Sequence, residues 1–173
     1  MYGRNYFMDR CVPEVKHYFM SLQWIDYFKP KNVLDWGCGT GLYMHFIQLE
    51  GIPCAGYDPN PWAAKLAYGT SKGAVIDKEP DGKYDLVLCI DVLEHLTIEE
   101  AKAAIRKIKD RSKVALFSIC FDNDPNFDKD PTHKIRLNRV QWIDLIKQEG
   151  MIVEDVPNDF LFKEQLLIGR VRS

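Results

Sequence analysis

The sequence predicts an α/β fold in three layers, with a doubly wound, mostly parallel seven-stranded sheet and a C-terminal antiparallel hairpin. Short apolar runs alternate with segments of helical spacing along the 173 residues, which is the pattern of a parallel sheet covered by helices. The run 84–90 (YDLVLCI) is the most hydrophobic, as expected of a central strand buried on both faces. Near the C-terminus two apolar runs are separated only by residues 157–159, so they must pair antiparallel.

The boundaries of the expected elements follow from apolar spacing and from the residues that start or end each segment. A helix begins at Pro13 and ends at Pro30, because proline fits the first turn of a helix but cannot continue one. Thr97 and Glu100 have the spacing of a capping box at the start of another helix. Further helices are expected over 42–50, 59–68, 98–108 and 137–148. Strands are expected over 32–36, 53–57, 74–76, 84–90, 114–121, 151–156 and 160–171.

Length and composition indicate a single domain over residues 1–173, in which 1–29 form an N-terminal segment and helix that could act as a lid. The contents of 46% hydrophobic and 28% charged residues are ordinary for a globular protein and argue against disorder. No apolar run approaches the roughly 20 residues that a membrane helix needs. The first ten residues also lack the apolar stretch of a signal peptide. We therefore expect no membrane partner.

Charge and cysteine content favour a cytoplasmic protein. The net charge of −2 lacks the basic excess that is usual in nucleic-acid-binding domains, so no nucleic-acid partner is expected. The five cysteines are scattered singly with no CxxC pair, which indicates neither a disulfide framework nor a zinc site. Such cysteine usage is typical of a reducing compartment.

A glycine-rich turn connects the first expected strand to the next helix. Its sequence is Asp35-Trp36-Gly37-Cys38-Gly39-Thr40-Gly41, and the helix that follows offers free N–H groups and the positive end of its dipole to a ligand. The GxGxG spacing differs from the GxGxxG pattern of NAD-binding folds, and no lysine follows as in a P-loop. Asp35 would repel a pyrophosphate and attract an ammonium group, which favours a zwitterionic or cationic ligand.

The segment DWGCGTG resembles the first motif of class I S-adenosylmethionine-dependent methyltransferases, and the resemblance extends from about Val33 to Val171. It implies an enzyme whose cofactor is S-adenosylmethionine. In that family the acid and the glycines of this loop hold the amino-acid end of the cofactor. The carry-over gives Asp35, Gly37, Cys38, Gly39 and Gly41 as cofactor-binding residues.

Further cofactor contacts are expected where the later strands end. An acid after the second strand can accept hydrogen bonds from both hydroxyls of a ribose, and the resemblance assigns this role to Asp58, with Pro59 beside it. The alternative is that Asp58 caps the next helix. Asp77 has the place of an acid that binds the adenine amino group, or it is a solvated loop residue. Residues Ile90, Asp91 and Val92 are expected near the methionine portion and the reactive methyl group.

Two histidines are candidate catalytic residues. The ending VLEHL of the fourth-strand segment resembles the subgroup that methylates small molecules, and its His95 is either a general base or a brace of the turn. Asp130-Pro131-Thr132-His133, followed by Trp142, resembles a pattern in several small methyltransferases. His133 is therefore a candidate base or substrate ligand, whereas the helical spacing of Trp142 indicates a core residue.

Substrate contacts are expected from the N-terminal segment and from the connection 121–136, which is long enough to indicate a function or disorder. The candidates are Tyr6, Arg10, His133 and Arg136. Four carboxylates in this connection invite a metal interpretation, but Phe127 and His133 stand where a calcium hand requires glycine and glutamate. We therefore expect no metal site.

The sequence thus predicts S-adenosylmethionine-dependent methyl transfer to a small-molecule or sugar-like acceptor. One alternative is a module that binds the cofactor without turnover, or whose pocket a partner chain completes. A second alternative, a nicotinamide oxidoreductase, is disfavoured by Asp35, by the GxGxG spacing and by the terminal hairpin. The Asn-Pro-Pro-Tyr type of tetrad that the resemblance associates with nucleic-acid amino-methylation is replaced by the residues at 90–93. The acceptor, the methylated atom and the oligomeric state stay open.

Overall fold

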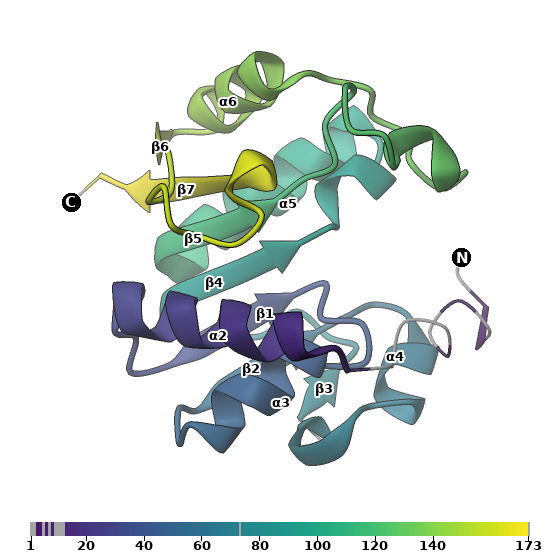
Figure 1. The fold of residues 1–173 in the computed structure, drawn as a ribbon, viewed down its shortest axis with the longest axis vertical. Coiled ribbons are helices and arrows are strands. Elements are labelled where there is room, and N and C mark those ends of the chain that lie inside the picture. The colour runs from purple at the N-terminus through teal and green to yellow at the C-terminus, as the bar shows by residue number, and fades with distance from the viewer. Residues whose placement is uncertain (1–2, 5, 7, 9–12, 73, 173) are drawn as a thin grey trace. The chain divides into compact units, whose positions relative to one another are not determined.

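The computed structural model describes residues 3–4, 6, 8, 13–72 and 74–172. Its strands form one seven-stranded sheet in the order β3-β2-β1-β4-β5-β7-β6 (Figure 1). Contacts divide the chain into two compact units, Met1–Leu88 and Cys89–Ser173. Among the described residues no helix is long and apolar enough to cross a membrane.

The first unit contains the parallel part of the sheet. Strand β1 (Val33–Trp36) pairs in parallel with β2 (Cys54–Tyr57) and with β4 (Tyr84–Ile90), and β2 pairs in parallel with the short β3 (Val75–Ile76). Helix α2 (Val15–Phe28) precedes β1, and helix α3 (Leu42–Leu49) connects β1 to β2. Helix α4 (Pro61–Lys65) and a 3-10 turn, η1 (Gly69–Ser71), connect β2 to β3. All four residues of β1 are buried, which makes this strand the centre of the unit's core.

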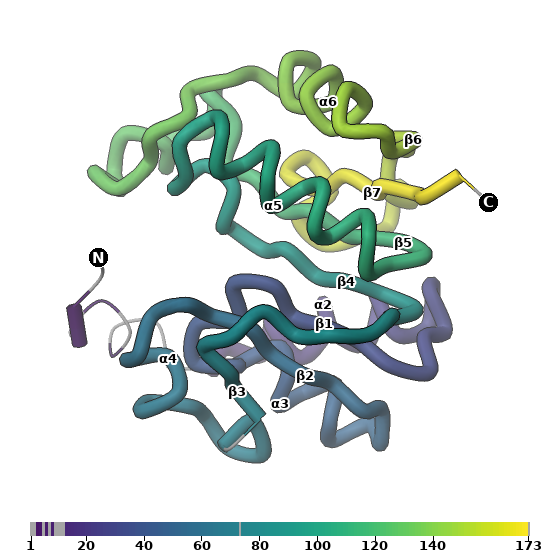
Figure 2. The backbone as a smooth tube through the Cα atoms, turned by 180° about the vertical axis from the view of Figure 1, so that it is seen from behind, coloured from purple at the N-terminus to yellow at the C-terminus, as the bar shows by residue number. Residues whose placement is uncertain are grey.

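The second unit contains the antiparallel part of the sheet. Strand β7 (Leu166–Val171) pairs antiparallel with both β5 (Ser112–Ser118) and β6 (Met151–Glu154) (Figure 2). Helices α5 (Ile98–Arg111) and α6 (Arg139–Gln148) complete it, and 3-10 turns occur at η2 (Leu93–His95), η3 (Phe127–Lys129) and η4 (Lys163–Gln165). Trp142 on α6 is fully buried, which confirms its expected place in the core.

The expected strand–helix alternation is confirmed, and several boundaries differ, most clearly those of α4, β5 and β7. Helix α4 is shorter than predicted because Asn60 is its cap, with its side chain accepting a hydrogen bond from the Trp62 amide at 3.1 Å. Strand β5 ends at Ser118, before the predicted end of the segment. Strand β7 starts at Leu166 and not at Phe160, because the chain turns through Phe162, whose φ of 57° is left-handed, and through η4. The antiparallel pairing of β6 with β7 is as predicted.

Gly41 connects the glycine-rich loop to α3 in a place that has no room for a side chain. It is the N-cap of α3 with φ of 74°, a left-handed conformation that favours glycine. A Cβ atom here would lie 2.6 Å from both Cβ and Oγ of Ser71, and 3.2 Å from Sδ of Met44. Gly51 has a similar φ of 78°, but a Cβ there would meet nothing within 4 Å.

A comparison of substitutions at these two glycines separates the cost of left-handed backbone strain from the cost of steric crowding. Gly51→Ala should cost only the left-handed strain, roughly 1–2 kcal/mol, whereas Gly41→Ala adds a steric clash of about 1–3 kcal/mol. Chemical denaturation should therefore show a larger loss of unfolding free energy for Gly41→Ala than for Gly51→Ala. Equal losses would mean that Ser71 and Met44 make room without cost.

Candidate functional site

The glycine-rich loop of the first unit is attached to the end of β2 through its backbone. The amides of Gly37 and Cys38 both donate to the carbonyl oxygen of Tyr57, at 2.7 and 3.1 Å. The amide of Gly41 donates to the carbonyl of Cys38 at 2.8 Å, which closes the turn before α3 begins. These bonds are made by backbone groups, so the shape of the loop does not depend on its side chains.

The side chain of Asp58 also holds the loop in place. It follows β2, and its Oδ2 accepts a hydrogen bond from the Gly39 amide at 2.9 Å, while its Oδ1 accepts from the Asn60 amide at 2.8 Å. Burial raises the pKa of the Asp58 carboxyl, and the two backbone hydrogen bonds oppose that rise. Asn60, not Asp58, supplies the side-chain cap of α4. Each Asp58 oxygen keeps further acceptor capacity, so the carboxylate can brace the loop and accept ribose hydroxyls at once.

Asp35 lies in β1, where its side chain is only 2% exposed. Among the described residues, no group donates a hydrogen bond to its buried Oδ2. Burial, and next the nearby negative charge of Asp58, raise the pKa of Asp35 to about 7. A buried acceptor without a partner is destabilising unless a ligand satisfies it. A cationic donor such as an ammonium group fits this atom, as the sequence predicts.

The other predicted cofactor residues of the first unit have different surroundings. Burial raises the pKa of the Cys38 thiol, which therefore stays neutral, so that Cys38 offers the loop its backbone and an uncharged side chain. Pro59 and Asp77 are exposed residues that follow β2 and β3. Their proposed contacts with the cofactor stay predictions.

In the second unit, β4 ends in a strained turn. Asp91 has φ of 54°, an uncommon conformation for a residue other than glycine. Ser118 supports it twice: its carbonyl accepts from the Asp91 amide at 2.9 Å, and its hydroxyl donates to Oδ1 of Asp91 at 2.6 Å. Strain of this kind is often found at functional sites. The flanking Ile90 and Val92 are half-buried, and the predicted contact of these three residues with the cofactor stays untested.

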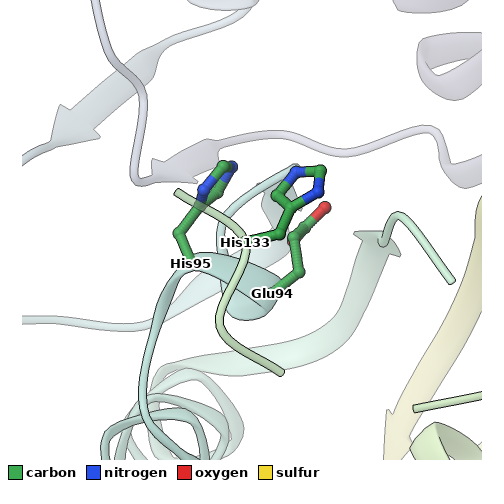
Figure 3. Close-up of side chains that lie close together, drawn as sticks. All are labelled: Glu94, His95 and His133. Atoms are coloured by element: carbon green, nitrogen blue, oxygen red, sulfur yellow. The ribbon is translucent and has the colours of Figure 1, made fainter. Parts of the chain in front are cut away.

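The turn η2 and the connection 121–136 are joined through the backbone of Glu94. Its carbonyl accepts hydrogen bonds from the amides of Lys134 and Ile135, at 2.7 and 3.1 Å. His133 therefore lies beside His95, with the ring centroids 4.7 Å apart (Figure 3). The structure thus brings together two histidines that separate sequence motifs predicted as candidate catalytic residues. His133 is half-buried, not open to solvent.

Hydrogen bonds orient both imidazole rings. Nδ1 of His95 lies 2.9 Å from Oγ1 of Thr132, and that hydroxyl donates its own proton to Oδ1 of Asp130. Nδ1 of His133 lies 2.9 Å from the carbonyl oxygen of Phe127. Both Nδ1 atoms therefore face acceptors and carry the ring proton in the neutral form, which leaves the lone pair on Nε2.

Glu94 completes this cluster, although no sequence motif singled it out as a functional residue. Its side chain is fully buried; Oε1 accepts a hydrogen bond from the Cys120 amide at 2.8 Å, and within the described part of the chain Oε2 has no partner. Burial, and next the charge of Asp91, raise the pKa of Glu94 to about 8. The acid adjoins His95 in sequence, but only the fold reveals that it is buried.

The predicted substrate residues are distributed differently. Arg136 is exposed, forms an ion pair with Asp128 and lies over the ring of Phe127, with 4.3 Å from its guanidinium carbon to the ring centroid. It is thus held within its own loop. Tyr6 is half-buried, whereas Arg10 lies outside the residues that the structure describes.

The curated relatives are methyltransferases, and the match with this chain covers only part of each relative's length. Norajmaline N-methyltransferase from Rauvolfia serpentina is 35% identical over 42% of this chain and 30% of that protein. Ubiquinone biosynthesis O-methyltransferase from Bordetella pertussis is 31% identical over 44% of this chain and 39% of that protein. Small RNA 2'-O-methyltransferase from Xenopus tropicalis is 27% identical over 73% of this chain and 43% of that protein. The chain therefore matches less than half the length of each of these relatives.

Solved structures share the fold at low sequence identity. An S-adenosylmethionine-dependent methyltransferase from Clostridium acetobutylicum has a TM-score of 0.72 at 11% identity, covering 96% of this chain and 95% of that one. Magnesium protoporphyrin IX methyltransferase from Synechocystis, solved with bound S-adenosylmethionine, has a TM-score of 0.67 at 17% identity, covering 91% and 81%. At these identities the likeness concerns the fold. The sequence pattern of the methyltransferase domain matches residues 10–151, and the chain belongs to this family.

Proposed function

We propose that this protein binds S-adenosylmethionine at the glycine-rich loop of its first unit and transfers the methyl group to a small-molecule acceptor. The observation that carries the proposal is the buried, unsatisfied oxygen of Asp35 beside that loop. The amino group of S-adenosylmethionine is a cation that would supply the missing donor. Family membership and a structural neighbour with the bound cofactor support the choice of ligand.

Different residues of the first unit would bind different parts of the cofactor. Asp35 would hold the ammonium group, and the turn at Gly37 and Gly39 would let the cofactor pack against bare backbone. Asp58 would accept the ribose hydroxyls while it keeps the Gly39 and Asn60 amides in place. The rest of the cofactor site would be lined by Cys38, Gly41, Pro59 and Asp77, with Asp77 at the adenine. When bound, the cofactor supplies an activated methyl group on a sulfonium.

The second unit would handle the acceptor. A hydroxyl or amine acceptor has to lose a proton as it takes the methyl group, and a group placed to receive that proton accelerates transfer. The acceptor would lose this proton at the cluster of Glu94, His95 and His133. The small-molecule class is favoured by two relatives that are an N-methyltransferase and an O-methyltransferase. Tyr6, Arg10 and Arg136 stay the proposed substrate contacts.

The first test concerns cofactor binding. Asp58→Ala removes both the brace of the loop and the acceptor for the ribose, and charge-assisted hydrogen bonds contribute roughly 1.5–3 kcal/mol each. Calorimetric titration with S-adenosylmethionine should show at least about tenfold weaker binding than in the unaltered protein. The exposed loop residue Asp81 offers a matched control, and Asp81→Ala should bind normally. Unchanged affinity in Asp58→Ala would place this residue outside the site.

The second test concerns transfer. The protein is incubated with methyl-labelled S-adenosylmethionine and a panel of small phenols, amines and sugars, with a short single-stranded RNA beside them. Label should enter a small acceptor. His133→Ala should lower turnover at least about tenfold while cofactor affinity stays within about threefold. His45→Gln, in the other unit, should behave as the unaltered protein.

Two results would contradict this proposal. Label in the RNA and in none of the small molecules would reassign the substrate class. Tight cofactor binding without transfer to any acceptor would favour the alternative of a binding module, or of a pocket that a partner chain completes.

A further inference from the structure

We propose that Glu94, His95 and His133 form a binding site for one divalent transition-metal ion. One ligand atom from each of these residues lies within 4.8 Å of those of the other two. Figure 3 shows the carboxylate of Glu94 next to the ring of His133; Glu94 and His95 both extend from the turn η2, and His133 extends from the connection 121–136. All three belong to the second unit, so the site needs no group from elsewhere in the chain.

The spacing of the cluster suits an ion after small side-chain rotations. Ligand bonds to zinc are about 2.0–2.2 Å in tetrahedral geometry, so two ligands of one ion lie roughly 3.3–3.6 Å apart. The separations in the cluster, up to 4.8 Å, exceed this by about 1 Å. Rotation about the side-chain bonds of the two half-buried histidines would bring the ligand atoms closer together.

The hydrogen bonds of the imidazoles are those of metal ligands. A histidine that binds a metal usually donates its other ring N–H to a carboxylate, a carbonyl or another oxygen, which fixes the tautomer and orients the ring. His133 does so through the Phe127 carbonyl, and His95 does so through the Thr132 hydroxyl. Thr132 in turn donates to Asp130, so a carboxylate supports His95 through one intervening hydroxyl.

The carboxylate of Glu94 gives the second, independent observation. It is fully buried, and within the described residues its Oε2 lacks any hydrogen-bond partner. Oε1, by contrast, is fixed by the Cys120 amide at 2.8 Å. A buried carboxylate oxygen of this kind is costly unless a cation or a donor satisfies it. A metal ion would satisfy it and would join it to the two imidazole lone pairs.

The ligand set indicates the kind of metal. Two imidazole nitrogens with one carboxylate suit zinc, iron, cobalt or manganese, whereas magnesium and calcium prefer oxygen ligands throughout. The expected absence of a metal rested on the carboxylates at 122–130, and of these only Asp130 takes part here, as a support for Thr132. The spacing of the carboxylates at 122–130 therefore did not predict this metal site.

Three protein ligands leave open positions on the ion, and an oxygen of the acceptor fits there. This step rests on the proposed function. A metal-bound hydroxyl loses its proton to water more readily than a free one. The oxygen would then form a bond to the methyl carbon, while the cofactor's sulfur keeps the electron pair of the broken bond and becomes a neutral thioether.

Metal binding is tested directly, without cofactor or acceptor. The full-length protein, stripped with a chelator, is titrated with Co²⁺ while its visible absorption is recorded, and with Zn²⁺ and Mg²⁺ by calorimetry. One equivalent of Co²⁺ should produce ligand-field bands, and Zn²⁺ should bind at least about tenfold more tightly than Mg²⁺. Glu94→Gln keeps an oxygen to accept from the Cys120 amide and removes the charge, and it should weaken Zn²⁺ binding at least about tenfold. His133→Gln should do the same.

Matched controls come from outside the cluster. Glu99→Gln changes an exposed glutamate at the start of α5, and His45→Gln changes a histidine of the other unit; both should bind as the unaltered protein does. Circular dichroism checks that each variant is folded. The proposal is overturned if the unaltered protein binds no Co²⁺ or Zn²⁺, or if folded Glu94→Gln and His133→Gln bind as tightly as the controls. Because neither titration uses S-adenosylmethionine, a failure here is distinct from a failure of the proposed function.

Discussion

Asp35 places a carboxylate in a strand whose every residue is buried, with one oxygen that no described group satisfies. An ionised carboxylate in such a place is destabilising, which is why its pKa is raised to about 7. The surroundings are arranged about this constraint. The backbone of the loop bonds to Tyr57 and to Asp58, so the turn after β1 is held by β2 and by the residue that follows it. None of the described residues resolves this constraint, and in our proposal the cation of the cofactor does.

A similar arrangement recurs in the second unit. Glu94 is fully buried with one unsatisfied oxygen, and it follows the strained residue Asp91 at the end of β4. Ser118 holds Asp91, and the Cys120 amide holds Glu94, so β5 and the residues after it fix both acids. Stability is given up at such positions when they serve a ligand. The two acids belong to the two sites proposed above, the cofactor site for Asp35 and the metal site for Glu94.

Much of the fold can be predicted from the sequence because local sequence patterns agree with the tertiary structure. The apolar run of β4 and the capping box of α5 are found where they were predicted. The start of β7 was wrong because residues such as Phe160 have strand-like composition, while the left-handed Phe162 turns the chain. No glycine in the sequence marks this left-handed position.

The candidate site was predictable to a different extent in its two parts. The glycine loop follows β1 and Asp58 follows β2, and the parallel pairing of these strands, which the alternation of strands and helices predicts, brings them together. The cluster around Glu94 depends on two backbone hydrogen bonds from Lys134 and Ile135, which join distant segments. A sequence shows that His95 and His133 exist, but it does not show that their rings are 4.7 Å apart or that Glu94 is buried beside them.

The central claim is that a cation of the cofactor binds the ionised form of Asp35. At about pH 6.5 this group is mostly protonated in the free protein, since its pKa is about 7, whereas an α-amino group is still a cation. Binding should lower the pKa of Asp35 and release its proton, so affinity should rise from about pH 5.5 to about pH 7. Calorimetric titration with S-adenosylmethionine at about pH 6.5, in buffers of different ionisation enthalpy, measures that proton directly. The account predicts release of at least about half a proton per cofactor bound, and loss of this release in Asp35→Asn. Binding without proton release, or an equal release from Asp35→Asn, would contradict it.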